Sequence, residues 1–352
     1  MHITELMKIE DLEKAIQDGL VSKRKHPVHP LYILNYTAAT QFEWNWNDVT
    51  LNCRGLVIDE NNHIVARSFP KFFSYEQLDG KLPQGKYTVE EKLDGSLLLA
   101  FRYNDEIITA TRGSFESEQA AKGKEFLSAI NFAIYEGVTY VFEIIYKDNR
   151  IVVDYDYEGL VLLDIFHTNY PQKNYWINDN ALNLAANYFG FRRPKIYDFK
   201  SLDEILSYNE QNIEGFVLLY STGERVKIKT DDYKRLHRLI TGVSEKTVWE
   251  ALKNNTFEQL IENVPDEFYS WVQNVKLDLE IKFKDIHNSA VKDYNALDWC
   301  EARKEFALEA VKTPYPSILF KWFDGLEADQ IIWNMVKPEV TKVFKMVGED
   351  SN

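Results

Sequence analysis

Cysteine is nearly absent from this chain, which has two such residues, Cys53 and Cys300. They lie far apart and have no neighbours at metal-ligand spacing, so the sequence predicts neither a disulfide scaffold nor a zinc site. Long apolar runs are also missing, because no stretch reaches the roughly 18 residues that a membrane helix needs. The first residues lack the basic and then apolar pattern of a signal peptide. These absences favour a cytoplasmic protein with reduced thiols and no membrane partner.

The composition excludes a disordered or fibrous chain, since 45% of the residues are hydrophobic and 27% are charged. No internal repeat and no low-complexity segment is visible. At 352 residues the chain is longer than most single cores, which seldom exceed about 250–300 residues. We therefore expect two domains and, because the sequence carries no signal for an oligomer, a monomer.

Positive charge is in short supply, since 41 Lys and Arg face 55 Asp and Glu, a net charge of −14. Taken alone, this global balance argues against a protein that coats nucleic acid through bulk positive charge. The charge is unevenly distributed, because residues 222–242 are mainly basic while residues 249–310 are mainly acidic. Any site for a polyanion must be local, and the acidic region is poorly suited to gripping RNA phosphates.

Apolar runs typical of strands fill the first two thirds of the chain. Three turn signals between them predict hairpins, at 59–62, 103–106 and 221–224. Helical spacing recurs at three places: the first twenty residues, 116–136 after a candidate cap at Ser114, and 178–189. From about residue 244 onward, long amphipathic stretches replace the strand signals. We predict a mixed α/β domain over residues 1–243 and a helical domain over residues 244–352.

A turn-forming segment, Glu91-Lys92-Leu93-Asp94-Gly95-Ser96, precedes an apolar run at 97–101. The Asp-Gly pair supplies a sharp turn that would present Lys92 at the edge of a strand. A lysine is a nucleophile only when it is uncharged, and nearby cations or a metal ion favour that state. A solvated lysine in a hairpin turn is the plain alternative for this motif taken alone.

Later strand-like runs contain carboxylates and lysines of the kind that nucleotide transfer needs. Glu143 lies within the apolar run 142–145, and Glu214 opens another. Because an unpaired buried charge is costly, each carboxylate either faces solvent or serves a metal. Lys227 and Lys229 fall on one side of a predicted strand, where they either line a groove for phosphates or form a solvated face.

Taken in order, these segments resemble the covalent nucleotidyltransferases, the superfamily of DNA ligases, RNA ligases and mRNA capping enzymes. The surrounding residues narrow the resemblance to the phage RNA ligase 1 family, over about residues 30–240. The segments that carry it are Leu51-Asn52-Cys53-Arg54-Gly55-Leu56, Lys71-Phe72-Phe73, Lys92-Leu93-Asp94-Gly95-Ser96, Arg112-Gly113-Ser114-Phe115, Phe142-Glu143, Asn212-Ile213-Glu214-Gly215 and Lys227-Ile228-Lys229-Thr230.

The resemblance implies an α+β fold. Its parts would be a nucleotidyltransferase domain of antiparallel sheets flanked by helices (1–243) and an all-helical C-terminal domain that selects the RNA substrate (244–352). It also implies an ATP-dependent RNA ligase that joins 5′-phosphate and 3′-hydroxyl ends, in RNA or tRNA repair. Lys92 would attack the α-phosphate of ATP and form a lysyl–AMP. AMP would then pass to the RNA 5′-phosphate, and the 3′-hydroxyl would displace it.

The roles of the site residues follow from the same resemblance. Glu143 and Glu214 would hold Mg²⁺, for which Mn²⁺ can substitute. The residues expected to bind ATP are Arg54, Lys71, Glu91, Arg112, Lys227 and Lys229. Arg112 departs from the family pattern, because Thr-Arg-Gly stands where Ser-Lys-Gly is common and a guanidinium differs in geometry from an ammonium. Three aromatic residues either flank the nucleotide or belong to the core: Phe73, Tyr233 and His237.

Two other functions stay open. A capping-type guanylyltransferase would use GTP for the same lysyl-nucleotide step, but it usually carries an oligonucleotide-binding barrel after the Lys-x-Lys segment, as does a DNA ligase. The helical texture after residue 244 disfavours both. An inactive relative that only binds RNA is disfavoured because Lys92, Glu143 and Glu214 are all present.

Overall fold

The computed structural model describes residues 1–149, 151–168, 179–264, 269–297 and 302–338. The chain divides into two compact units, Met1–Ile240 and Thr241–Asn352. The domain boundary expected from the sequence, between residues 243 and 244, lies close to this division. Among the described residues, no helix is both long and apolar enough to cross a bilayer.

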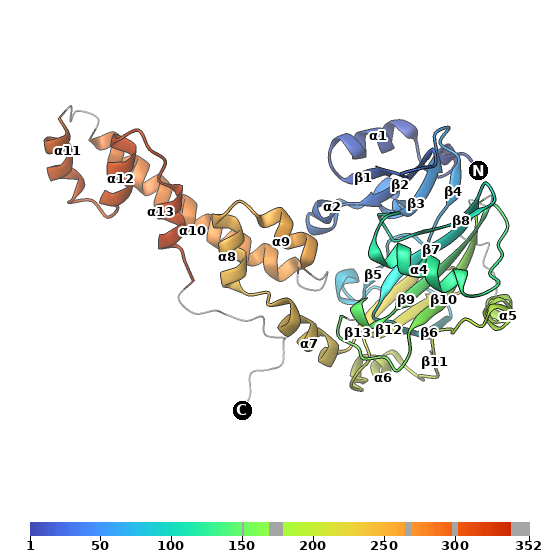
Figure 1. Ribbon diagram of the computed structural model, residues 1–352. Helices are drawn as coiled ribbons and strands as arrows, with labels where there is room; N and C mark the ends of the chain where they lie inside the picture. The colour runs from blue at the N-terminus through green and yellow to red at the C-terminus, as the bar shows by residue number, and fades with distance from the viewer. Residues whose placement is uncertain (150, 169–178, 265–268, 298–301, 339–352) are drawn as a thin grey trace. The chain divides into compact units, whose positions relative to one another are not determined.

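Three sheets form the frame of the first unit (Figure 1). In order of pairing, the N-terminal sheet contains β1 (Val21–Lys25), β2 (Leu31–Tyr36), β3 (Arg54–Asp59) and β4 (Ile64–Ala66). The second sheet contains β10 (Gly159–His167), β9 (Val138–Ile145), β7 (Ser96–Tyr103) and β8 (Glu106–Ala110). The third contains β11 (Ile196–Tyr197), β6 (Tyr87–Lys92), β12 (Gly215–Tyr220), β13 (Arg225–Lys229) and β5 (Phe73–Ser74). The strands pair antiparallel except for β13 with β5, so the predicted α+β class is confirmed.

Helices cover these sheets and close the core. Leu98, Phe142 and Leu162 are buried between the second sheet, α4 and α5. Leu34, Leu56 and other apolar residues of the N-terminal sheet are buried against α1 and α3. The helices of this unit are α1 (Ile9–Gln17), α2 (Ala38–Phe42), α3 (Asp48–Asn52), α4 (Glu118–Ser128), α5 (Asp179–Phe189), α6 (Leu202–Ser207) and α7 (Asp231–Thr241), with short 3₁₀ turns at Ile3–Glu5, Glu76–Leu78 and Lys147–Asn149.

The three predicted hairpins are confirmed, because each turn signal joins a pair of adjacent antiparallel strands: β3 with β4, β7 with β8, and β12 with β13. The helix expected over 116–136 is shorter. It is capped by Ser117, whose hydroxyl accepts from the Ala120 N–H, rather than by Ser114, and it ends at Ser128. Beyond it, Phe132 and Ile134 are buried at a spacing of two residues, which suits extended backbone better than helix.

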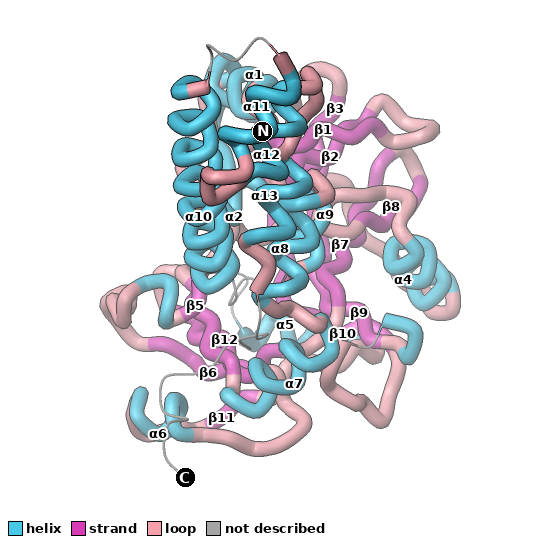
Figure 2. Tube along the Cα trace, turned by 90° about the vertical axis from the view of Figure 1, so that its left-hand side faces the viewer, coloured by secondary structure: helices cyan, strands magenta, loops and turns pink. Residues whose placement is uncertain are grey.

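The second unit contains only helices among its described residues (Figure 2). They are α8 (Glu245–Lys253), α9 (Phe257–Asn263), α10 (Tyr269–Ala296), α11 (Arg303–Ala310), α12 (Pro316–Phe323) and α13 (Asp329–Met335). The long helix α10 contacts α8, α12 and α13. Its C-terminal half packs on a core that includes Phe306, Ile318 and Leu319. A hydrogen bond joins α8 to α13, since the Trp249 Nε1–H donates to the Trp333 carbonyl oxygen at 2.7 Å. The predicted helical C-terminal region is confirmed.

Candidate active site

The turn predicted to present a nucleophile joins two sheets of the first unit. Lys92 is the last residue of β6 in the third sheet, and Ser96 is the first residue of β7 in the second. Gly95 is required between them, because a Cβ there would lie 2.5 Å from the carbonyl oxygen of Ile144 and 3.1 Å from Glu143 Cγ. The turn therefore packs directly on β9, without space for any other residue.

Strand register brings Lys92 to its partners. Gly215 of β12 lies opposite Lys92 of β6 on one side and opposite Lys229 of β13 on the other. Glu214, the preceding residue, thus lies between two lysines: Oε2 is 2.8 Å from Lys92 Nζ and Oε1 is 3.1 Å from Lys229 Nζ. Gly215 adopts φ +151°, and a Cβ there would clash with the Ile228 carbonyl oxygen at 2.0 Å, so only glycine permits this approach.

Glu214 is a buried, doubly paired carboxylate with 3% of its surface exposed. Burial raises the pKa of this carboxyl, but the ion pairs with Lys92 and Lys229 outweigh burial and leave the pKa below its ordinary value. The alternative of a solvated face is wrong for Glu214. The carboxylate is instead the counterion that two lysines share.

Glu143 faces the same turn from β9, where it lies opposite Leu97 of β7. Its Oε1 accepts the Gly95 N–H at 3.1 Å. Burial raises the pKa of Glu143 to about 7, although the nearby Lys92 opposes that rise. A carboxylate whose charge is this poorly compensated would be stabilised by a divalent cation, so its donor chemistry fits Mg²⁺. Glu214 fits less directly, because both of its oxygens are paired with lysines.

The Asp94 side chain holds the turn in place through hydrogen bonds to distant parts of the chain. Its Oδ2 accepts the backbone N–H groups of Val152 and Val153 at 2.7 and 2.8 Å, and its Oδ1 accepts the Tyr233 hydroxyl at 2.7 Å. Its own N–H donates to the Tyr155 hydroxyl at 2.7 Å. Tyr233 is buried and therefore serves the turn rather than the surface of a nucleotide site. The sequence motif identified Asp94 only as a turn residue, because these partners are distant in the chain.

A cavity of about 570 Å³ opens above Lys92 and is lined by residues of all three sheets. Five of the nine predicted site residues line it: Arg54, Glu91, Lys92, Arg112 and Glu143. Glu214 and Lys229 do not line it, but Glu214 forms an ion pair with Lys92, and Lys229 forms an ion pair with the same carboxylate. Lys71 and Lys227 do not line it, and each has 8% of its surface exposed.

This arrangement agrees with a family comparison. The family model described as RNA ligase matches residues 52–233, slightly more than half of the chain. The chain belongs to this RNA ligase family. The resemblance to the phage RNA ligase 1 family is thereby confirmed.

Individual relatives of this RNA ligase family member are distant in sequence. It is 27% identical over 279 residues to a protein of Autographa californica nuclear polyhedrosis virus that is assigned as a bifunctional polynucleotide kinase/RNA ligase, covering 68% of this chain and 38% of that protein. It is 25% identical over 235 residues to a protein assigned as an RNA ligase in Thermovibrio ammonificans, covering 60% of each. The chain thus spans less than two thirds of the length of either relative. An archaeal ATP-dependent RNA ligase of known structure is 13% identical, with a TM-score of 0.49, covering 90% of this chain and 79% of the other.

Arg54 lines the cavity, and its guanidinium lies near two phenylalanine rings. Its guanidinium carbon lies 4.6 Å from the ring centroid of Phe69 and 5.8 Å from that of Phe72. Its Nη1 is buried and has no hydrogen-bond partner among the described residues. Burial lowers the pKa of Arg54. A buried donor without a partner is costly, so an anion or acceptor brought into the cavity would relieve it.

Lys71 is enclosed by aromatic rings. Its Nζ lies 5.3–5.7 Å from the ring centroids of Tyr36, Trp46 and Phe73, and donates to Gln41 Oε1 at 2.6 Å. Phe73 therefore packs on Lys71, a contact that sequence spacing could not indicate. Cation–π contacts of this kind hold an ammonium in place while leaving its charge intact.

Arg112, like Lys71, makes a cation–π contact with the Tyr36 ring, and unlike Lys71 it lines the cavity. Its Nη1 donates to the Tyr36 hydroxyl at 2.8 Å, and its guanidinium lies 4.8 Å from the ring centroid. Glu91 lines the cavity beside Lys92, and burial raises its pKa despite the opposing charge of Lys195.

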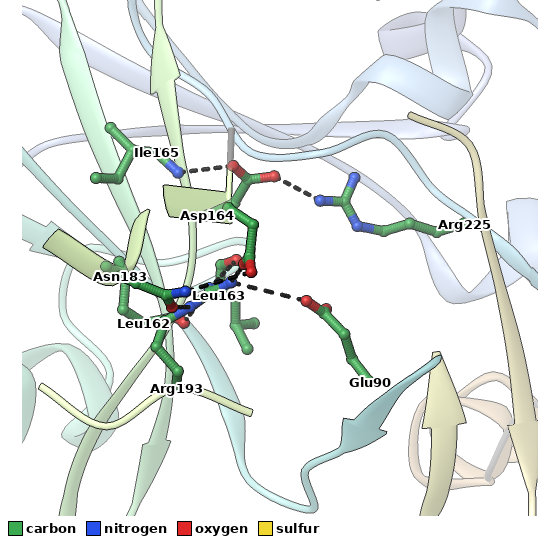
Figure 3. A network of polar contacts seen from close by, with 9 residues as sticks. Glu90, Leu162, Leu163, Asp164, Ile165, Asn183, Arg193 and Arg225 are labelled. Carbon is green, nitrogen blue, oxygen red and sulfur yellow. Dashed lines mark hydrogen bonds and ion pairs between the residues drawn. The ribbon is translucent and has the colours of Figure 1, made fainter. Parts of the chain in front are cut away.

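A buried ion network that the sequence did not indicate joins the sheets on either side of the cavity (Figure 3). Arg225 of β13 pairs with Asp164 of β10 at 2.5 Å, with 7% and 3% of the side chains exposed. Arg193 donates to the carbonyl oxygens of Leu162 and Leu163 at 2.8 and 2.9 Å and lies 3.7 Å from Glu90 of β6. Glu90 and Arg225 also line the cavity, so the network fixes its walls. It depends on a register shift between Leu162 and Asp164, which has no sequence signature.

Proposed function

We propose that this RNA ligase family member is an ATP-dependent RNA ligase that joins 5′-phosphate and 3′-hydroxyl RNA ends. The observation that carries the proposal is the position of Lys92, which lies at the cavity wall 2.8 Å from the buried Glu214. The two carboxylates, Glu214 and Glu143, hold the Lys92 ammonium at the cavity wall. A divalent cation bound by these carboxylates would compete with the ammonium for them and so favour the neutral amine that attacks.

In the first step the deprotonated amine of Lys92 attacks the α-phosphorus of ATP. A P–N bond forms, the P–O bond to the β-phosphate breaks, and pyrophosphate leaves with the bonding electrons. The proton from Lys92 passes to solvent or to a neighbouring carboxylate. Lys71, Lys227, Lys229 and Arg54 stabilise the negative charge of the triphosphate, as the family resemblance implies, while Glu91 and Arg112 contact the nucleotide.

In the second step an oxygen of the RNA 5′-phosphate attacks the phosphorus of the lysyl–AMP, the P–N bond breaks, and Lys92 regains a proton. In the third step the 3′-hydroxyl oxygen of the other end attacks the activated 5′-phosphorus and gives its proton to solvent. A P–O bond joins the strands, the anhydride P–O bond breaks, and AMP leaves with the bonding electrons. Both transfers depend mainly on positioning and charge neutralisation, which rigid strands provide better than loops.

Glu143 and Glu214 are the residues proposed to hold Mg²⁺ or Mn²⁺. When bound, the metal supplies charge neutralisation at the α-phosphate. Among the described residues, no three His, Cys, Asp or Glu side chains gather at one point. Much of the coordination would therefore come from water and phosphate, as Mg²⁺ commonly prefers.

The physiological substrate is proposed to be broken RNA, with cleaved tRNA as one candidate, and the active form a monomer. The helical second unit is proposed to select among RNA ends by their shape. Its acidic surface favours shape recognition over a grip on phosphates, since phosphate affinity grows with the number of cations that displace counterions.

One labelling experiment tests the reaction. The purified chain is incubated with α-labelled ATP or GTP and a divalent metal, and then separated on a denaturing gel. A covalent adenylate that Lys92→Ala abolishes supports the ligase, whereas a guanylate would identify a capping-type enzyme, and no label would leave an RNA-binding relative. Sealing of cleaved tRNA, linear single strands and nicked duplexes then identifies the substrate.

A further inference from the structure

A basic edge strand borders the cavity, and none of the residues proposed to contact ATP belongs to it. β1 is the outer strand of the N-terminal sheet, and three of its five residues are cations: Lys23, Arg24 and Lys25. Ser22 and Arg24 line the cavity, while Lys23 lies on the other side, where its Nζ is 4.5 Å from the Tyr32 ring centroid. One face of β1 thus forms part of the cavity wall.

Strand pairing turns this face into a continuous polar row. Ser22 lies opposite Asn35 of β2, and Asn35 lies opposite Arg54 of β3. The Ser22 hydroxyl donates to the Asn35 carbonyl at 3.2 Å, which fixes the outer end of the row. The row therefore runs from the rim of the sheet to Arg54, which lines the same cavity as Lys92.

The row carries polar atoms that are available to a ligand. Asn35 Oδ1 and Arg54 Nη1 are buried and have no hydrogen-bond partner among the described residues. The Arg24 guanidinium is exposed and makes no hydrogen bond or ion pair with any residue that the structure describes. Arg24 lies beside the row, two residues along β1 from Ser22 and on the same face. A buried acceptor and a buried donor without partners are costly, and with the exposed cation next to them they suit the sugar and phosphates of a nucleotide strand.

We propose that this row, with Arg24 as its phosphate contact, binds the RNA strand that carries the 5′-phosphate. The inference rests on the proposed function. The strand that receives AMP reacts through a terminal phosphate, an anion that must reach the Lys92 adenylate, whereas its later partner reacts through an uncharged hydroxyl. A cation beside the cavity therefore fits the first of the two strands. The phosphates of ATP share the same chemistry, and the test separates these two sources.

The test isolates the second step. Wild-type chain, Arg24→Ala and Lys23→Ala are labelled with α-labelled ATP, freed of ATP, and mixed with excess 5′-phosphorylated single-stranded RNA. Transfer of AMP is followed against RNA concentration at several salt concentrations. Lys23→Ala is the matched control, because it removes the same charge from the opposite face of the same strand. Both side chains lie on an edge strand, so folding is not at issue, and circular dichroism verifies it.

Arg24→Ala is expected to label with ATP at the wild-type rate but to need about fivefold more RNA for half-maximal transfer. Its dependence of log affinity on log salt should be shallower by about 0.7, the contribution of one phosphate contact on a single strand. Lys23→Ala should match the wild type in both respects.

Three outcomes would overturn the inference. If Arg24→Ala raises the ATP concentration needed for labelling, the cation serves ATP. If Lys23→Ala and Arg24→Ala lose RNA affinity equally, the strand is an unspecific basic edge, and if neither loses affinity the row does not bind the strand. Failure of the wild type to label would instead reject the proposed function itself, so the two failures are distinguishable.

Discussion

The two units use charged side chains in opposite ways. In the first unit, the buried Glu214, which directly precedes β12, pairs with Lys92 of β6 and Lys229 of β13. In the second unit, ion pairs lie on exposed helix faces, as with Lys246 and Glu250, which are one helical turn apart at 3.7 Å. Because a buried charge is costly unless it is paired, whereas an exposed pair contributes little, the difference locates the chemistry in the first unit.

The largest expected effect comes from the nucleophile. Lys92→Ala should abolish protein adenylation, and Lys92→Arg should do no better, since a guanidinium stays protonated. Lys246→Ala, a lysine of the second unit, is the control and should label normally. Labelling of either Lys92 variant at the wild-type rate, measured on a denaturing gel, would reject the assignment.

The shared carboxylate should be nearly as important. Glu214→Gln keeps the shape of the side chain but leaves Lys92 and Lys229 without their counterion. We expect adenylation to slow by about 10²–10³, the usual cost of losing one preorganised electrostatic contact. Glu250→Gln, which removes an exposed carboxylate from the second unit, should leave the rate unchanged. Similar rates in the two variants would contradict the distinction between buried and exposed charge.

Breaking an ion pair should lower the stability of the fold much more in the first unit, where the pair is buried, than in the second, where it is exposed. Asp164→Ala removes the carboxylate that pairs with the buried Arg225, and breaking a buried ion pair typically costs about 3–5 kcal/mol, or about 10 °C in melting temperature for a domain of this size. Glu250→Ala breaks an exposed pair and should cost at most about 0.5 kcal/mol. Thermal unfolding followed by circular dichroism compares the two, and equal shifts would show that burial is not the deciding factor.

A smaller effect should depend on pH. Glu143 is protonated up to about pH 7 in the folded chain but only up to its ordinary pKa of about 4.5 when unfolded. The folded state binds more protons between these values, so the stability from this group is present at low pH and lost as pH rises through 7. Glu143→Gln should therefore melt about 2 °C or more above wild type at pH 8 but not at pH 5.

Metal addition sharpens the same measurement. Mg²⁺ at pH 8 should raise the melting temperature of the wild type more than that of Glu143→Gln, because the ionised carboxylate gains a counterion that the amide cannot use. A variant with the same advantage at both pH values, or with the same response to Mg²⁺, would contradict the role of Glu143.

Removing the second unit should affect adenylation least. A chain that ends at Gly242 retains every described residue of the cavity and should still label with ATP. If the second unit selects the substrate as proposed, the ratio of sealing rates on cleaved tRNA and on linear RNA should be lower for this shortened chain than for the full chain. Circular dichroism shows whether it is folded. An unchanged ratio in a folded, labelling chain would reject a role in substrate choice, whereas an unfolded chain would assign the second unit to stability.

Local patterns predicted local structure well, because turns and apolar periods act over a few residues. The three hairpins and the helical C-terminal region are of this kind, and motif order indicated Lys92 and both glutamates. Glu214 was expected to face solvent or a metal, yet it is paired with two lysines, since strand register and not spacing brings them together. The ion pair of Asp164 and Arg225 joins strands 61 residues apart and could not be predicted from sequence.

Gly95 fits tightly against the carbonyl oxygen of Ile144, so the turn that follows Lys92 packs on β9. With a would-be Cβ only 2.5 Å from that carbonyl oxygen, any other residue at position 95 would push the turn away from β9. The turn that follows Lys92 thus lies against the strand that carries Glu143 at a distance too short for a side chain.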